Sequence, residues 1–301
     1  MQLYFAEMLP IPGHLLVAGL SYLGIDACLR ATHGLHSPPE AWTTTVGIWS
    51  VFNLFAILRL MDEIKDLDSD RSLFPERPLP SGRVLESDIR ITLRAAMALY
   101  LGVNATLGPP FVTALVVLGW AWLMYRWFYI PGILRANLML AFATHQPIVG
   151  LMLLHGFSTS LARAGIGVGA MRWPAVLACI VMIWCAFAGW EIARKTRHAE
   201  EETRYVTYSR VLGRRGAVAF GASFHVASAA LALYLQRVLH LPGAWFAPLA
   251  VALLAMLGAD ALFLLRTGAR PIRLRKFAEA YLVVLLATQA AAFGWRAWGP
   301  G

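Results

Sequence analysis

Apolar runs long enough to cross a lipid bilayer recur along the whole chain, and they limit what it can fold into. A helix needs about 20 apolar residues to span the hydrocarbon layer. Hydropathy predicts nine such spans, at residues 11–28, 43–61, 88–107, 110–129, 136–155, 174–193, 215–236, 243–265 and 277–298. Only 14% of the 301 residues are charged, whereas about 25% are charged in soluble domains. The sequence therefore predicts an all-α polytopic membrane bundle, with residues 1–301 as a single transmembrane domain.

The 26 Lys and Arg residues divide unevenly between the two ends of these spans. Alternate connections hold 21 of them, and the opposite side holds five: Arg30, Arg163, Arg172, Arg237 and Arg296. Because basic residues accumulate in cytoplasmic loops, this asymmetry predicts a cytoplasmic N-terminus and a C-terminus on the other side. Topology and anionic lipid account for the net charge of +9, so nucleic acid is not an expected partner.

One connection on the predicted cytoplasmic side is unusually acidic. Eight of the 17 carboxylates lie between Asp62 and Asp88. If the helix over 43–61 continues to residue 70, Lys65 and Asp68 point one way and four acids share an arc of about 100° on the other side: Asp62, Glu63, Asp66 and Asp70. Carboxylates on one face repel each other unless a cation lies between them, and Mg²⁺ prefers oxygen ligands. These four acids are the predicted metal ligands, although a solvated acidic loop balanced by its own Lys and Arg is the alternative.

The stretch FPERPLPSGRV (residues 74–84) follows the acids. Its three prolines disfavour a helix, and Ser81-Gly82 predicts a turn. A rigid, extended segment would let Arg77 reach back over the carboxylates and bind phosphate oxygens. A surface loop shaped only by prolines fits the same pattern.

DEIKDLDSD followed by ERPLPSGRV resembles the first signature of the UbiA superfamily of intramembrane prenyltransferases. Asp66 and Asp70 stand at the later two Asp positions of that signature, Glu63 replaces the first Asp, and Asp62 replaces an Asn. The resemblance covers essentially the whole chain. It implies a nine-helix bundle that binds an isoprenyl diphosphate through Mg²⁺ and transfers the isoprenyl group to an acceptor; some relatives cyclise it instead.

A second charged stretch, beginning GWEIARKTRHAEEE at residue 189, lies where the second Asp-rich signature of the family belongs. Glu191 keeps the leading acid, but Arg194 stands where the next Asp is expected, with Lys195 beside it. If the segment is helical, these three residues share a face with His198 and Glu202. We expect Arg194 and Lys195 to bind the diphosphate directly and Glu191 to hold a second ion. The alternative is that Glu191 pairs with Lys195 and supports the helix.

Weaker candidates lie elsewhere in the chain. YRWFYIPGILR resembles the family's connection near the diphosphate, with Arg135 in the basic position and Arg126 and Tyr129 close by in sequence. Basic residues placed only by topology would look the same. Asp260 lies in mid-span, where an ionisable group is costly unless it faces a cavity or a partner. Asn53 lies about two turns before the acidic cluster and is a candidate for the same cavity.

The sequence thus predicts a Mg²⁺-dependent prenyltransferase in the membrane, with a prenyl diphosphate donor and an acceptor that the residues do not identify. Metal and cations would withdraw the diphosphate and leave an allylic cation in a dry tunnel. The expected catalytic residues are Asp66, Asp70, Arg194 and Lys195. One alternative is a terpene cyclase on the same scaffold, which needs no acceptor. The other is a non-catalytic transporter or lipid-binding protein, which acids at the membrane edge rather than the midplane disfavour.

Overall fold

The computed structural model describes residues 1–266 and 272–299, and within these ranges it contains helices and no strand. Arg270, one of the basic residues assigned above to the cytoplasmic side, lies outside the described residues. The chain groups into two compact units. Unit 1 comprises Met1–Leu23 and Pro39–Gly165, and unit 2 comprises Gly24–Pro38 and Ile166–Gly301.

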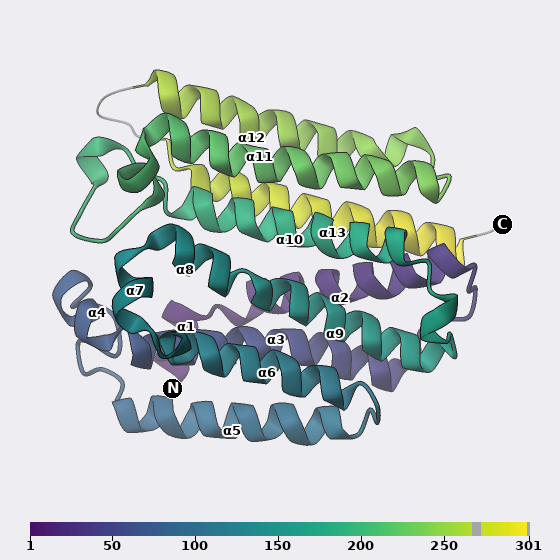
Figure 1. Cartoon of the computed structure of the whole chain (residues 1–301), viewed down its shortest axis with the longest axis horizontal. Coiled ribbons are helices and arrows are strands. Elements are labelled where there is room, and N and C mark those ends of the chain that lie inside the picture. Colours follow the sequence, from purple (N-terminus) through teal and green to yellow (C-terminus); the bar gives the residue numbers. More distant parts are fainter. Residues whose placement is uncertain (267–271, 300–301) are drawn as a thin grey trace. The chain divides into compact units, whose positions relative to one another are not determined.

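The helices follow one another along the chain as shown in Figure 1. Helix α2 (Ile11–His33) contributes to both units. Unit 1 also contains α1 (Gln2–Met8), α3 (Ala41–Lys65), α4 (Leu67–Leu73), α5 (Glu86–Ala105), α6 (Phe111–Tyr125), η1 (Trp127–Tyr129), α7 (Pro131–Ala136), α8 (Leu138–His145) and α9 (Pro147–Ala164). Unit 2 also contains η2 (Val168–Ala170), α10 (Trp173–Arg194), η3 (Ala199–Glu201), α11 (Tyr208–Val238), η4 (Gly243–Phe246), α12 (Ala247–Leu265) and α13 (Leu274–Trp298).

Seven helical segments of the described ranges are long and apolar enough to cross a membrane. They are Ile11–His33, Ala41–Lys65, Leu138–Ala164, Trp173–Arg194, Tyr208–Val238, Gly243–Leu265 and Leu274–Trp298. The prediction of an all-α membrane bundle is confirmed. The count of nine spans is not, because α6 is apolar but only 15 residues long, and α5 carries charge over its first turns.

Three predicted boundaries are wrong, each for a local reason. The fourth span was expected to reach residue 129, but α6 ends at Tyr125 because the three residues of η1 have positive φ angles. The fifth was expected at 136–155, but the structure has a break at Gln146 between two helices. The second of them, α9, continues to Ala164, so residues 156–164 are helical and do not belong to the connection before the sixth span. Pro147 suits the first position of α9, and Gly165, with φ of 66°, ends it. The seventh begins early, at Tyr208, with a kink at Gly213.

Unit 1 is a bundle in which α3 packs against α5, α6 and α9. One face of α3 is buried along its length. Close approach is needed at Gly47, because an added Cβ would lie 2.0 Å from Cε2 of Tyr22 on α2. Asn104 of α5 accepts hydrogen bonds from Ser50 of α3 (3.1 Å) and contacts Nε2 of His155 of α9 at 2.9 Å. Polar contacts of this kind hold three helices together away from the acidic segment.

Unit 2 is built around α10, which packs against both α11 and α13, while α12 packs against α11 and α13. Helix α10 is apolar almost all round, as expected for a helix surrounded by other helices. Gly189 allows α11 to come close, since an added Cβ would lie 2.7 Å from Nε2 of His225. The side chain of His225 is fully buried there.

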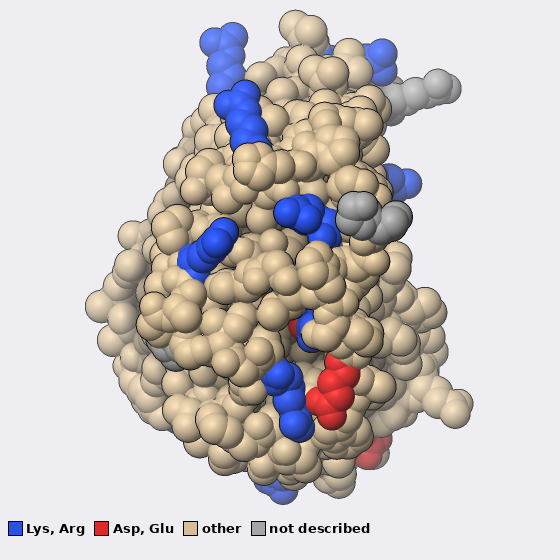
Figure 2. All heavy atoms as spheres, turned by 90° about the vertical axis from the view of Figure 1, so that its right-hand side faces the viewer, with Lys and Arg blue, Asp and Glu red and all other residues tan. Residues whose placement is uncertain are grey.

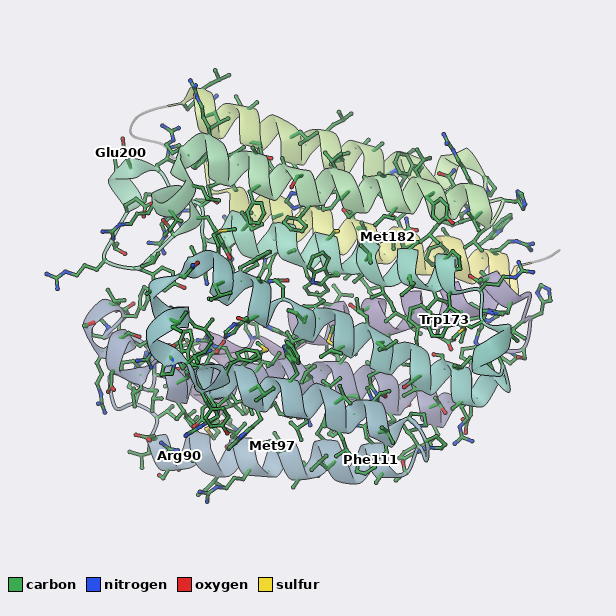
Figure 3. All side chains as sticks on the ribbon, viewed as in Figure 1. Arg90, Met97, Phe111, Trp173, Met182 and Glu200 are labelled. Carbon is green, nitrogen blue, oxygen red and sulfur yellow. The ribbon has the colours of Figure 1, made fainter. Side chains whose placement is uncertain are left out.

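Figure 3 identifies the two ends of each unit. In unit 1, Arg90 lies near the start of α5 and Phe111 lies at the far end of the α5–α6 hairpin. In unit 2, Trp173 begins α10, and Glu200 lies in the connection beyond its other end. Figure 2 views the side that carries the Phe111 end: basic side chains are scattered over it, acidic ones are few, and most of the surface is uncharged.

Candidate active site

The acidic segment is two helices joined at Asp66, and the continuous helix expected through Asp70 is wrong. Helix α3 ends at Lys65, Asp66 has φ of −103° and ψ of 5°, and α4 begins at Leu67. The backbone remains closely connected, since the N–H of Asp66 donates to the carbonyl of Asp62 (2.9 Å) and that of Asp70 to Asp66 (2.8 Å). The break is electrostatically favourable, because it places Lys65 in the last turn of one helix and Asp68 and Asp70 in the first turn of the next.

Glu63 is the most deeply buried acid of the segment, with 2% of the residue exposed. One carboxylate oxygen, Oε1, accepts a hydrogen bond from Arg59, one turn earlier on α3. The other, Oε2, is buried and accepts no hydrogen bond from the described residues. Asp70 and Arg77 lie within electrostatic reach of Glu63. Glu63 therefore faces the interior of unit 1 with one oxygen open.

Asp70 is also buried and is paired with Arg77. The guanidinium Nη1 of Arg77 donates to Oδ2 of Asp70 at 2.8 Å, and its Cζ lies 3.8 Å from the ring centroid of Phe74. The proline-rich segment that carries Arg77 is not extended, as had been expected, but folds into successive turns. The N–H of Ser81 donates to Arg77 (3.0 Å), that of Val84 to Pro78 (3.0 Å), and Gly82 has φ of 77°. The predicted turn at Ser81-Gly82 is present.

Asp62 and Lys65 form a third pair, with Nζ of Lys65 2.8 Å from Oδ1 of Asp62. The expectation that Lys65 points away from the carboxylates is wrong, because its flexible stem brings the ammonium back across one helical turn. That ammonium also lies 4.7 Å from the ring centroid of Trp127. Asp66 is half-buried at the helix break. The four predicted metal ligands thus stay on neighbouring turns, and Asp62, Glu63 and Asp70 each pair with a basic side chain.

The N-terminal helix α1 brings in residues that sequence reasoning missed. Tyr4 is fully buried and lies within electrostatic reach of Glu63 and Arg59. Burial raises the pKa of Tyr4 above its usual range, and the nearby carboxylate of Glu63 adds to the shift, so the hydroxyl keeps its proton. Helix α1 is also tied to the proline-rich turn, because Arg83 donates to both carboxylate oxygens of Glu7, at 2.6 and 3.0 Å.

The connection after α6 forms a left-handed turn beside these residues. Trp127, Phe128 and Tyr129 have φ of 51°, 50° and 60°, which non-glycine residues rarely adopt. The Cζ of Arg135 lies 5.3 Å from the ring centroid of Trp127, and that of Arg126 lies 5.6 Å from Tyr129. Arg126, Tyr129 and Arg135 are all exposed. The ring of Trp127 therefore connects the predicted basic residue Arg135 to the Lys65–Asp62 pair.

The second charged stretch lies in unit 2 and differs from the predicted helix. Helix α10 ends at Arg194, and the chain turns back so that the N–H of Tyr208 donates to the carbonyl of Lys195 (3.0 Å). His198 instead packs on Phe263, with ring centroids 4.0 Å apart, and Glu202 accepts hydrogen bonds from Thr207 at the start of α11. The shared face predicted for His198 and Glu202 is therefore wrong.

Glu191, Arg194 and Lys195 do come together at the end of α10. The carboxylate of Glu191 accepts a hydrogen bond from Nε of Arg194, and Nζ of Lys195 lies 3.0 Å from Oε1 of Glu191. Burial alone would lower the pKa of Lys195, but the charge of Glu191 outweighs it and raises that pKa above its usual range. Lys195 is therefore protonated at neutral pH. The pairing of Glu191 with Lys195, the alternative given above, is present.

The two intramembrane candidates have different surroundings. Asn53 donates through Nδ2 to the carbonyl of Ala96 (2.9 Å), so its amide is used in the contact between α3 and α5. Asp260 of α12 is 5% exposed, and its Oδ2 has no hydrogen-bond partner among the described residues. Asn53 therefore has a packing role, whereas Asp260 keeps an open polar atom within unit 2.

The acids of unit 1 fit a partial Mg²⁺ site and not a closed metal cage. In residues 1–266 and 272–299, no three His, Cys, Asp or Glu side chains form a group that could hold a metal ion. Mg²⁺ at phosphate sites, however, is usually held by one or two carboxylates, with substrate oxygens and water completing its shell. Glu63, with Oε2 open, and the neighbouring Asp70 supply that number of oxygen ligands.

Comparison with known proteins gives structural relatives. The sequence matches no family model and no curated protein. The apo structure of a UbiA homologue from Aeropyrum pernix K1 is similar, with a TM-score of 0.67 and 19% identity over 92% of this chain and 96% of that one.

Two further solved structures are similar over nearly their whole length. A digeranylgeranylglyceryl phosphate synthase has a TM-score of 0.62 and 15% identity over 98% of both chains. A UbiA homologue from Archaeoglobus fulgidus, bound to DMAPP and Mg²⁺, has a TM-score of 0.55 and 15% identity over 93% of this chain and 98% of that one. The chain therefore has the UbiA fold that the residues of its first acidic segment had indicated.

Proposed function

We propose that the chain is a UbiA-type enzyme that transfers an isoprenyl group from a prenyl diphosphate to a lipophilic acceptor inside the membrane, with Mg²⁺ as cofactor. The fold supports this reading, since the similar structures include a prenyl-lipid synthase and a homologue that binds DMAPP and Mg²⁺. The observation that carries the proposal is the buried pair of acids, Glu63 and Asp70, where an apolar span ends.

Two carboxylates at such a place are costly unless they bind cations. In the structure, Arg59 and Arg77 fill that role for Glu63 and Asp70, while Oε2 of Glu63 remains open. Mg²⁺, held by these two acids with Asp62 and Asp66 as further ligands, would supply the charge that stabilises the leaving diphosphate.

The basic residues would orient the substrate. Arg77 is placed to exchange its contact with Asp70 for phosphate oxygens, because a guanidinium can donate to both kinds of anion with the same geometry. Lys65 and Arg135, held over the ring of Trp127, offer further positive charge in unit 1. The apolar, buried face of α3 beyond them would exclude water from the cation that is left when the diphosphate departs.

Arg194 and Lys195, at the end of α10, are proposed to bind diphosphate oxygens. Glu191 binds both of them. We therefore propose that Glu191 positions Arg194 and Lys195. Glu191 would bind a second ion only when these two cations have moved onto the phosphate. We place the N-terminus and these connections on the cytoplasmic side, following the distribution of basic residues.

The test is a survey of diphosphate release by the purified protein in lipid nanodiscs, using dimethylallyl, geranyl, farnesyl and geranylgeranyl diphosphates. Release from at least one donor that stops when Mg²⁺ is chelated would support the proposal. A cyclic product formed without added acceptor would assign the chain to the terpene cyclases instead. Failure to release diphosphate from every donor, with lipid and aromatic acceptors present, would contradict an enzymatic role.

A further inference from the structure

Unit 2 contains an arginine-lined cavity of about 360 Å³. Its walls come from the end of α10, the segment that follows it, and the start of α13. Four arginines and one acid supply its charged lining: Arg194, Arg197, Arg273, Arg275 and Glu201. A concave surface with this excess of guanidinium groups is the kind of place that attracts an anion.

The contacts of these arginines leave the lining with positive charge in excess. Arg275 pairs with Glu279 (2.7 Å), and Nε of Arg273 lies 3.9 Å from Oε1 of Glu201, beyond hydrogen-bond distance. Arg197 donates to the backbone carbonyl of Glu201 at 3.4 Å, a long bond to a neutral group. Arg273 and Arg275 are largely exposed, with 73% and 64% of their side chains accessible, so both can turn toward a ligand.

The position of the cavity indicates the source of the anion. Helix α10 ends at Arg194 and α13 begins at Leu274, and both helices are long and apolar enough to cross a membrane. Because both helices are long enough to span a bilayer, we expect the ends that line the cavity to lie near the membrane surface, where lipid phosphates are. Phe277, four residues after Arg273 and therefore on the same side of α13, is 40% exposed and is a large apolar side chain one turn from the basic lining. Basic pockets between membrane helices bind the head groups of anionic lipids in this way.

We propose that the cavity binds a phosphate group, and that the phosphate belongs to an anionic membrane lipid. A free phosphate or diphosphate shares the same chemistry, but it would not use the apolar surface around Phe277. Arg197, Arg273 and Arg275 have no role in the proposed prenyl transfer. Arg194 lines the cavity and is also proposed to bind the substrate diphosphate, so it is left unchanged in the test.

The experiment measures retention of phosphatidylglycerol against phosphatidylcholine by the full chain in detergent, using native mass spectrometry over a range of lipid concentrations. Each basic side chain near an anionic lipid contributes about a fivefold factor in binding. The double variant Arg197→Gln/Arg273→Gln should therefore retain phosphatidylglycerol about 25-fold less tightly, with phosphatidylcholine unaffected. A second arm adds inorganic phosphate or diphosphate without lipid and follows thermal unfolding.

Two control variants make the result decisive. Arg204→Gln removes one charge from an exposed position in the same connection, outside the cavity lining, and should change retention by less than about twofold. Arg197→Lys/Arg273→Lys keeps the charge and should restore most of the retention, which a misfolded protein would not do.

Stabilisation by inorganic phosphate, with no preference between the two lipids, would assign the site to a free anion. The proposal is overturned if the wild type shows neither response, or if Arg204→Gln loses as much retention as Arg197→Gln/Arg273→Gln. Diphosphate release from a prenyl donor should stay within twofold in the double variant. Failure of the lipid site and failure of the proposed enzyme activity are therefore observed separately.

Discussion

Replacing Glu63 by glutamine separates the two roles that its position allows, namely pairing with Arg59 and binding a metal. The substitution keeps the shape of the side chain and removes its charge. Only 1% of the Glu63 side chain is exposed, but 28% of that of Arg59 is, so water can partly replace the lost partner. Breaking a fully buried pair costs about 3–5 kcal/mol, and this exposure reduces the expected cost to about 2 kcal/mol.

The effect on activity should be larger than the effect on stability. If Glu63 holds the ion that stabilises the departing diphosphate, its loss should slow release by about 10²–10³-fold, the range found when one group that stabilises transition-state charge is removed. The assay is steady-state diphosphate release in nanodiscs at saturating Mg²⁺, run beside thermal unfolding followed by circular dichroism.

The double variant Arg59→Gln/Glu63→Gln completes the test. It removes both charges, so most of the lost stability should return, while diphosphate release stays low. If Glu63→Gln turned over within twofold of the wild type, the metal-binding role of this carboxylate would be refuted. If the double variant regained both stability and activity, Glu63 would matter only as the partner of Arg59.

Three other outcomes follow from the contacts in unit 1. Arg77→Gln should lower Mg²⁺-dependent diphosphate release by about 10–100-fold, because Arg77 is the partner of a buried acid. The control Arg71→Gln changes an arginine with 60% of its side chain exposed, and its release should stay within twofold of the wild type in the same assay. Gly47→Ala should lower the free energy of unfolding by about 1–3 kcal/mol, because the added methyl group clashes with Tyr22. Gly102 has open space around it, so Gly102→Ala should leave the free energy of unfolding unchanged or raise it by up to about 1 kcal/mol. Thermal unfolding measures both effects. Hydrogen bonds from Arg83 lower the pKa of Glu7. The pair therefore stabilises α1 at any pH above the ordinary pKa of a glutamate, and this stabilisation is lost as the pH falls through the lowered pKa of Glu7. Hydrogen exchange of α1 should be faster in Arg83→Gln than in the wild type at neutral pH, and the difference should disappear in acid.

The sequence predicts the fold well because hydrophobic length carries most of the information in a membrane protein. An apolar run such as residues 174–193 can cross a bilayer only as a helix, and α10 covers this run with one extra residue at each end, from Trp173 to Arg194. Connections are harder to predict. The positive φ angles after Tyr125 and the break at Asp66 are local changes of backbone conformation, which hydropathy does not describe.

The candidate site is predicted in part for the same reason. Helical spacing correctly grouped Glu63 with the other acids of the segment. The same spacing also places Arg59, four residues before Glu63, on the same face, and this pairing could have been predicted but was not. Tyr4 gave no such signal, because its contact with the acids depends on how α1 folds back. In unit 2, the helical face drawn through His198 failed because the chain leaves the helix at Lys195.

The left-handed turn of η1 restricts which sequences the α6–α7 connection can accept. Each non-glycine residue in this conformation costs about 1–2 kcal/mol, so most substitutions toward glycine or asparagine would relax the backbone. At Trp127 the same exchange would delete the ring that lies beside Lys65 and Arg135. Substitution among homologues should therefore be rare at Trp127, where an easier backbone would be gained only by losing the ring that orients two cations.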